Sequence, residues 1–258
     1  MLRLASINRW QAGGGHLAIS AVIGLAVLAA MILVWYPPPY FQASGGNDLV
    51  LLMVGVDVTL GPLLTFAVFN PAKGLGKLRF DLAVIGVCQV AALAYGVHVM
   101  FVARPVYLVY AVDRFDLVMS NMLPDAELAK APAPWNRRPV GRPPTIGVKL
   151  PTDPKLKEES LFQALAGVDL PSQARFHVPY AEVARDAAAH AQPIGELRKL
   201  NPDLVGRIDR AVRASGRDEQ SLGFVGGAAP IRDFAVLVER GSGTIVDMLM
   251  AQPWSAPR

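Results

Sequence analysis

Residues Leu49–Phe69 read LVLLMVGVDVTLGPLLTFAVF and decide how the chain is organised. A helix of about 20 apolar residues covers the ~30 Å hydrocarbon core of a bilayer, so this stretch predicts a transmembrane helix. Asp57 lies near its middle. An ionised carboxylate at that depth costs about 2.5–3.5 kcal/mol or more and normally faces protein or water, which makes Asp57 a candidate functional residue.

Small residues surround Asp57 on this predicted helix. Glycine and threonine thin the helix surface and let another helix approach closely. Pro62 has no backbone N–H to donate and is expected to kink the helix. The predicted intramembrane contact set is therefore Gly55, Asp57, Thr59, Gly61 and Pro62. The set serves either a partner helix or packing among this chain's own helices, and the sequence leaves both open.

A first apolar stretch precedes this one, at residues 17–35. It is longer than the ~7–15 residue core of a signal peptide, and prolines follow it in place of a cleavage site. We therefore expect an uncleaved transmembrane helix. Aromatic residues at its end fit the aromatic belt of a membrane interface; they are Trp35, Tyr36, Tyr40 and Phe41.

A third apolar stretch covers residues 81–102. Asp81 stands at its predicted start, where the positive end of the helix dipole favours an anion. Gln89 and His98 lie within it, and we expect both side chains to hydrogen-bond to neighbouring helices. The three stretches together predict three transmembrane helices.

Composition separates the chain into two parts. Of the 258 residues 52% are hydrophobic and 18% are charged, whereas soluble domains carry about 25% charged residues. Most charged residues follow Arg104. We therefore expect a three-helix transmembrane domain at residues 1–103 and a soluble α+β domain at residues 104–258.

Loop charges predict the orientation in the membrane. Basic residues cluster in the segment before the first span and in the loop between the second and third spans: Arg3, Arg9, Lys73, Lys77 and Arg79. The positive-inside rule places both segments in the cytoplasm. The N-terminus is then cytoplasmic and the C-terminal domain lies outside. In a Gram-negative bacterium, this is a multi-pass inner-membrane protein with a periplasmic domain.

The sequence of the soluble part predicts strands at both ends and helices between them. Residues 106–112 are rich in β-branched and aromatic side chains, and residues 234–249 read as a closing β-hairpin that joins the same sheet. Helices are expected at 153–166, 179–191 and 193–215, the last broken near Pro202. Asp153 should cap the first of these helices; its expected apolar face consists of Leu156, Leu161 and Leu165.

No residue pattern in the chain indicates catalysis or a cofactor. Cys88 is the single cysteine and the four histidines are isolated, so neither a disulfide nor a metal site is expected. Asp113 and Asp116 bracket Arg114 and read as a local ion-pair cluster. The glycines at 223–227 lack a phosphate-loop lysine and read as a turn. No long basic run points to nucleic acid.

Three segments carry a resemblance to a known family. They are GVDVTLGPLLTF (55–66), RPVYLVYAVDRF (104–115) and VLVERGSGTIVDMLMAQPW (236–254). With the three-span layout, these segments resemble the TfpX/TfpZ family of type IV pilin accessory proteins. The resemblance implies an inner-membrane protein that associates with a type IV major pilin and supports or modulates pilus assembly and twitching motility. Since no catalytic motif is visible, we expect that the protein is not an enzyme. A pilin-modifying membrane enzyme is the alternative, and a homo-oligomer is left open.

Overall fold

The computed structural model describes residues 8–255, and the side chains of residues 48–49, 51–54, 56–57 and 71 lie outside that description. The chain forms two compact units. The first comprises the chain up to Leu33 together with Gly46–Val102. The second comprises Val34–Gly45 together with the chain from Ala103 onward.

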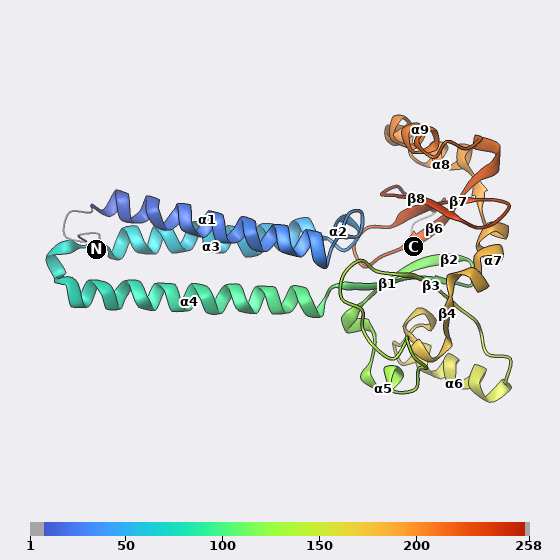
Figure 1. Cartoon of the computed structure of the whole chain (residues 1–258), viewed down its shortest axis with the longest axis horizontal. Coiled ribbons are helices and arrows are strands. Elements are labelled where there is room, and N and C mark those ends of the chain that lie inside the picture. The colour runs from blue at the N-terminus through green and yellow to red at the C-terminus, as the bar shows by residue number, and fades with distance from the viewer. Residues whose placement is uncertain (1–7, 256–258) are drawn as a thin grey trace. The chain divides into compact units, whose positions relative to one another are not determined.

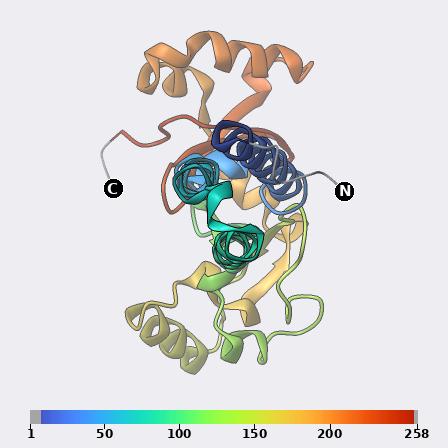
Figure 2. The same ribbon diagram turned by 90° about the vertical axis from the view of Figure 1, so that its left-hand side faces the viewer.

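The first unit consists of three long helices. They are α1 (Arg9–Val34), α3 (Gly46–Val68) and α4 (Leu75–Val102), with a 3-10 turn at Pro71–Lys73 before α4. Figure 2 looks along these helices and shows them side by side. Within the described part of the chain, α1 and α4 are long and apolar enough to cross a membrane, and α3 contributes a shorter apolar segment, Val58–Val68.

Helices α1 and α4 begin well before the apolar spans that the sequence predicts. The Gln11 N–H donates to Asn8 Oδ1 at 2.9 Å, and the Asn8 N–H donates to Gln11 Oε1 at 3.1 Å. This reciprocal capping box starts α1 well before the apolar run. Because α4 begins at Leu75, Asp81 lies inside the helix and not at its start. Its carboxylate pairs with the Lys73 ammonium at 3.7 Å.

Residues 34–45 form a connector between α1 and α3 and belong to the second unit. The connector contains the short helix α2 (Tyr40–Ala43). Tyr36 is 0% exposed and Tyr40 is 5% exposed, and the Arg232 N–H donates to Ala43 O at 3.2 Å. Burial raises the pKa of the Tyr36 phenol. The predicted interfacial belt is therefore wrong for both tyrosines, which are core residues of the domain.

The second unit is built on one mixed sheet. Its strand order is β4-β3-β1-β2-β6-β7-β8, and β5 pairs with β6. The strands are β1 (Pro105–Ala111), β2 (Arg114–Met119), β3 (Thr145–Val148), β4 (His177–Pro179), β5 (Gln192–Pro193), β6 (Leu222–Ala228), β7 (Phe234–Glu239) and β8 (Ile245–Leu249). The predicted closing hairpin is confirmed as β7–β8, and β1 lies in the same sheet, separated from it by β2 and β6.

The glycine cluster does not form the predicted turn but lies in strand β6. A Cβ at Gly226 would collide with the Trp254 indole, and one at Gly227 would collide with the Phe234 ring. The Trp254 indole N–H donates to Asp233 Oδ2 at 2.8 Å, which helps to hold that ring in place. Glycine is needed here because aromatic rings pack directly on the strand backbone.

Helices lie on both sides of the sheet (Figure 1). They are α5 (Asp125–Leu128), α6 (Pro154–Leu165), α7 (Ala184–Ala189), α8 (Ile194–Leu200) and α9 (Val205–Ala214). Short 3-10 turns connect these elements at Ser120–Met122, Leu170–Ser172, Ala174–Phe176, Tyr180–Glu182, Pro202–Leu204 and Glu219–Ser221. Leu197 of α8 and Ile208 of α9 belong to one core cluster with Phe224 and Leu237 of the sheet.

The structure confirms the predicted cap of α6 but not its predicted apolar face. The Asp153 carboxylate accepts the Lys155 and Leu156 N–H groups. However, Leu161 is 63% and Leu165 78% exposed. Ser160 is buried in their place, and its carbonyl accepts a hydrogen bond from Gln173 at 3.0 Å. Polar packing thus decides which side of α6 faces the domain.

Candidate intramembrane interface

Helix α1 packs antiparallel against α3 through a polar and an aromatic contact. His16 Nδ1 and Thr65 Oγ1 are joined by a 2.5 Å hydrogen bond, and Thr65 is 2% exposed. One and a half turns earlier, the Trp10 ring lies 4.6 Å from the Phe66 ring. Since the start of α1 meets the end of α3, the two helices run in opposite directions.

Helix α3 packs against α4 at Gly61. This glycine is buried, and a Cβ there would collide with the Gln89 carboxamide of α4. Gly61 therefore serves packing within the bundle, which was one of the two roles left open. The structure brings Gln89 to α3, whereas His98 is exposed and forms no hydrogen bond within the described part of the chain.

The other predicted contact residues lie elsewhere on α3. A Cβ at Gly55 would meet no atom within 4 Å, and Thr59 is exposed. The Pro62 carbonyl faces Gly13 of α1, 3.5 Å from its Cβ position. Asp57 lies in α3, but its side chain falls outside the described residues. A partner contact at Gly55 and Thr59 stays a prediction.

A groove lies between α1 and α4, with a volume of about 190 Å³. Its lining, which we call the α1–α4 groove, is His16, Ile19, Ser20, Ile23 and Gly24 of α1 with Gly86, Gln89, Val90 and Leu93 of α4. Ser20 is 9% exposed, and its hydroxyl forms no hydrogen bond to any described residue. Polar groups in hydrocarbon are costly unless they find a partner. The Ser20 hydroxyl therefore marks the groove as a place where a polar group from outside the described residues would be favourable.

This groove was not predicted from the sequence. His16 was expected to be isolated, and the first span was expected to begin after it. A signal was present, since His16, Ser20 and Gly24 are spaced four residues apart and fall on one helix face. Small and polar residues at that spacing are typical of helix contacts in membranes.

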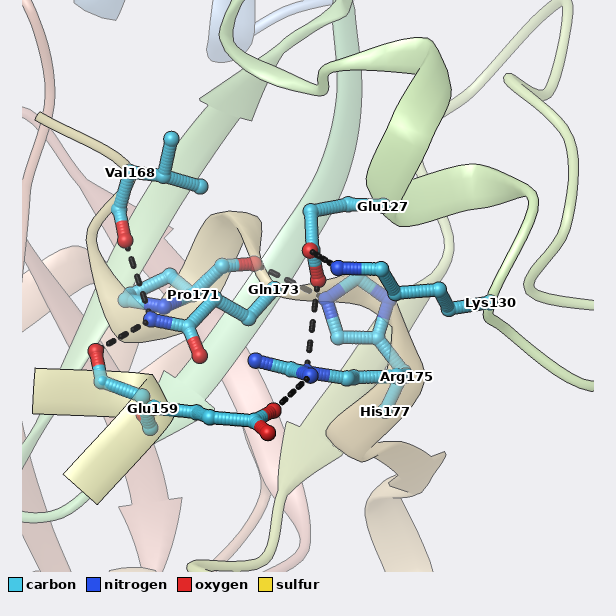
Figure 3. A network of polar contacts seen from close by, with 9 residues as sticks. Glu127, Lys130, Glu159, Val168, Pro171, Gln173, Arg175 and His177 are labelled. Carbon is cyan, nitrogen blue, oxygen red and sulfur yellow. Dashed lines mark hydrogen bonds and ion pairs between the residues drawn. The ribbon is translucent and has the colours of Figure 1, made fainter. Parts of the chain in front are cut away.

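The second unit contains a buried polar network, shown in Figure 3. The Glu127 carboxylate of α5 is 2% exposed. It pairs with Lys130 at 3.0 Å and with Arg175 at 3.5 Å, and Arg175 reaches Glu159 of α6 at 3.0 Å. Two cations thus neutralise the buried carboxylate, which ties α5 and α6 to the turn before β4.

Two further side chains hold the same segment. Gln173 is fully buried, and its amide donates to Ser160 O and Val168 O, both at 3.0 Å. His177 Nε2 lies 2.8 Å from Pro171 O, so this nitrogen carries the proton. Burial lowers the His177 pKa, and the ring is neutral. These contacts fix the backbone, and the network reads as structural.

Of the two aspartates expected to pair with Arg114, one does so. Arg114 Nε lies 3.2 Å from Asp116 Oδ1, while Asp113 lies exposed in the β1–β2 turn. Within the described residues, no group of three His, Cys, Asp or Glu side chains is placed to hold a metal ion.

The fold defines a protein with an apolar helical part and a mixed α/β domain, and comparisons show its family. The family model described as fimbrial assembly protein FimB matches residues 5–45. Three relatives from Dichelobacter nodosus are named fimbrial assembly protein. That of serogroup E1 is 30% identical over 189 residues, or 73% of this chain and 74% of the relative. The chain belongs to this fimbrial assembly protein family.

Two other relatives with the same name also match this chain. The protein of serogroup I is 29% identical over 189 residues, covering 73% of this chain and 74% of the relative. That of serogroups C1 and C2 is 34% identical over 118 residues, covering 46% of this chain and 90% of the relative. No solved structure matches the chain. The matched stretch 5–45 contains α1 and the connector.

Proposed function

We propose that this protein is a bacterial inner-membrane accessory protein that binds the major pilin of type IV pili. In this role it supports or modulates pilus assembly and twitching motility. The observation that carries the proposal is the 30% identity to a fimbrial assembly protein over about three quarters of both chains. The resemblance of three segments to the TfpX/TfpZ family supports the type IV assignment. The role is binding and not catalysis.

The α1–α4 groove is the contact that we assign to the pilin. A pilin rests in the inner membrane through one apolar helix before assembly. Gly24 and Gly86 let such a helix approach closely, while Ser20 presents its hydroxyl to the groove. A bound helix that satisfies Ser20 removes the cost of leaving its hydroxyl in hydrocarbon. Lipid chains cannot do this, which favours a helix as the occupant.

Filling the groove tests this assignment. We expect Ser20→Leu to lower the pilin recovered per unit of tagged protein from detergent extracts by several-fold, because the larger side chain occupies the groove. The amount of surface pili in the Ser20→Leu strain should differ from that of the unmodified strain. Ala18→Leu adds similar bulk at an exposed position of α1 that does not line the groove and should recover pilin normally. Equal recovery for both variants at equal abundance would remove the groove from the proposal.

The connector also supports a third transmembrane helix. The chain enters the second unit at Val34, leaves it after Gly45 and returns at Ala103. Val34 and Ala103 therefore lie on the same side of the membrane. If α1 and α4 each cross the bilayer toward that side, the segment between them must cross back, and α3 is the helix in that segment. We propose that α3 spans the membrane, with the N-terminus cytoplasmic and the domain periplasmic.

Reporter fusions test this orientation. A reporter that is active only outside the cytoplasm should be active when fused after Arg258 and silent when inserted at Gly74, in the turn between α3 and α4. The physical reason is the basic group formed by Lys73 in the turn and by Lys77 and Arg79 at the start of α4, which the positive-inside rule retains in the cytoplasm. Activity at both positions would mean that α3 does not cross the membrane.

A further inference from the structure

Helix α9 carries a row of arginines on the face opposite the domain core. Ile208 and Val212 turn inward and are 1% and 7% exposed. Arg207, Arg210 and Arg213 are all exposed. At three residues apart they fall on one side of the helix. The row is a basic surface, which we call the α9 arginine face.

The charge of this face is not neutralised within the protein. None of the three arginines forms a salt bridge or side-chain hydrogen bond with any other described residue. By contrast, Arg198 of α8 is paired with Asp209 at 2.8 Å and with Glu219 at 2.6 Å. Asp203 precedes the row by one turn and carries the opposite charge, so the face retains an excess of two positive charges.

We propose that the α9 arginine face docks on the anionic phospholipid headgroups of the membrane in which the chain is anchored. A guanidinium presents paired N–H donors that match a phosphate group. The second unit is joined to apolar helices at Val34 and at Ala103. These covalent connections keep the arginine face close to the membrane that holds the helices. Headgroups are therefore present at high effective concentration.

The composition of the face favours a lipid surface over a protein partner. Its other exposed positions are Gly206 and Ala214, so no aromatic or large aliphatic side chain accompanies the arginines. Arginines contribute strongly to protein interfaces where they are packed in desolvated pockets beside aromatic side chains, and α9 offers no such ring. A face that offers charge alone suits an anionic surface, where each basic residue contributes about five-fold to binding.

The test uses the full chain in nanodiscs. A fluorophore is attached at Ala214→Cys in a Cys88→Ser background, and its quenching by a headgroup-linked quencher reports docking. We expect strong quenching in nanodiscs that contain phosphatidylglycerol, weak quenching in phosphatidylcholine alone, and loss of quenching at high salt. Replacing Arg207, Arg210 and Arg213 by glutamine should lower the docked-to-undocked ratio by roughly a hundred-fold.

A matched control removes the same charge elsewhere. Lys155→Gln, Lys157→Gln and Arg185→Gln take away three exposed positive charges, and this variant should dock normally. Equal quenching in neutral and anionic nanodiscs would overturn the proposal, as would equal effects of the two triple variants. Loss of a co-purified acidic protein from the arginine variant, with unchanged quenching, would assign the face to that protein instead.

Discussion

Tyr36→Ala is expected to lower the free energy of unfolding of the second unit by about 3–5 kcal/mol, as for other large aromatic side chains removed from a core. Tyr36 is 0% exposed, and it lies in the connector, which belongs to the second unit although the rest of that unit begins only at Ala103. Such a loss is a large share of the ~5–15 kcal/mol by which domains are stable. Denaturant unfolding of the detergent-solubilised full chain, followed by protease resistance of the domain, measures it.

Tyr95→Ala is the matched control. Tyr95 is 71% exposed on α4, so the same truncation removes little buried surface and should change stability by less than about 0.5 kcal/mol. Tyr40→Ala should lower the free energy of unfolding as Tyr36→Ala does, since Tyr40 is 5% exposed. If Tyr36→Ala unfolds at the same denaturant concentration as the unmodified chain, the connector is not part of the domain core.

Gly61→Leu is expected to destabilise the helical unit by about 1–3 kcal/mol or more, because the new side chain has no space. Even a Cβ at this position would collide with Gln89, so α3 and α4 must separate to admit leucine. Helices in membranes depend on close packing at small residues. The thermal stability of the purified protein in detergent, together with its abundance in membranes, gives the measurement.

Gly55→Leu provides the control in the same helix. A Cβ at Gly55 meets no atom within 4 Å, so this variant should match the unmodified protein in stability. A pilin contact at Gly55 and Thr59 would show separately, as reduced pilin recovery from a stable Gly55→Leu protein. Equal stability of the Gly55→Leu and Gly61→Leu variants would contradict the packing of α3 on α4.

The sequence correctly predicted the elements that depend on residues close together in the chain. The closing hairpin, the Asp153 cap and the break at Asn201-Pro202 each depend on residues a few positions apart, and the structure has all three. The apolar stretches were visible for the same reason. The turn between β1 and β2 was missed because Val112 adopts φ 63°, a conformation that a β-branched residue rarely takes.

Features set by distant residues could not be read from the sequence. The glycines of β6 are required by Trp254 and Phe234, and neither ring is predicted from the glycines themselves. Likewise, α6 presents Ser160 inward because Gln173 reaches its carbonyl. The candidate groove was missed in part for this reason, since Gln89 is brought to it by α4 while His16 and Ser20 come from α1.

If α3 spans the membrane as proposed, the connector makes correct membrane insertion a condition for folding the domain. Residues 34–45 are synthesised first, and the rest of the second unit, from Ala103 onward, follows only after α3 and α4. If α3 fails to cross, the connector and the later chain emerge on opposite sides of the membrane. The domain then lacks two core tyrosines and exposes the surface that they cover. An inverted chain is thereby also a misfolded one, which proteases and chaperones recognise.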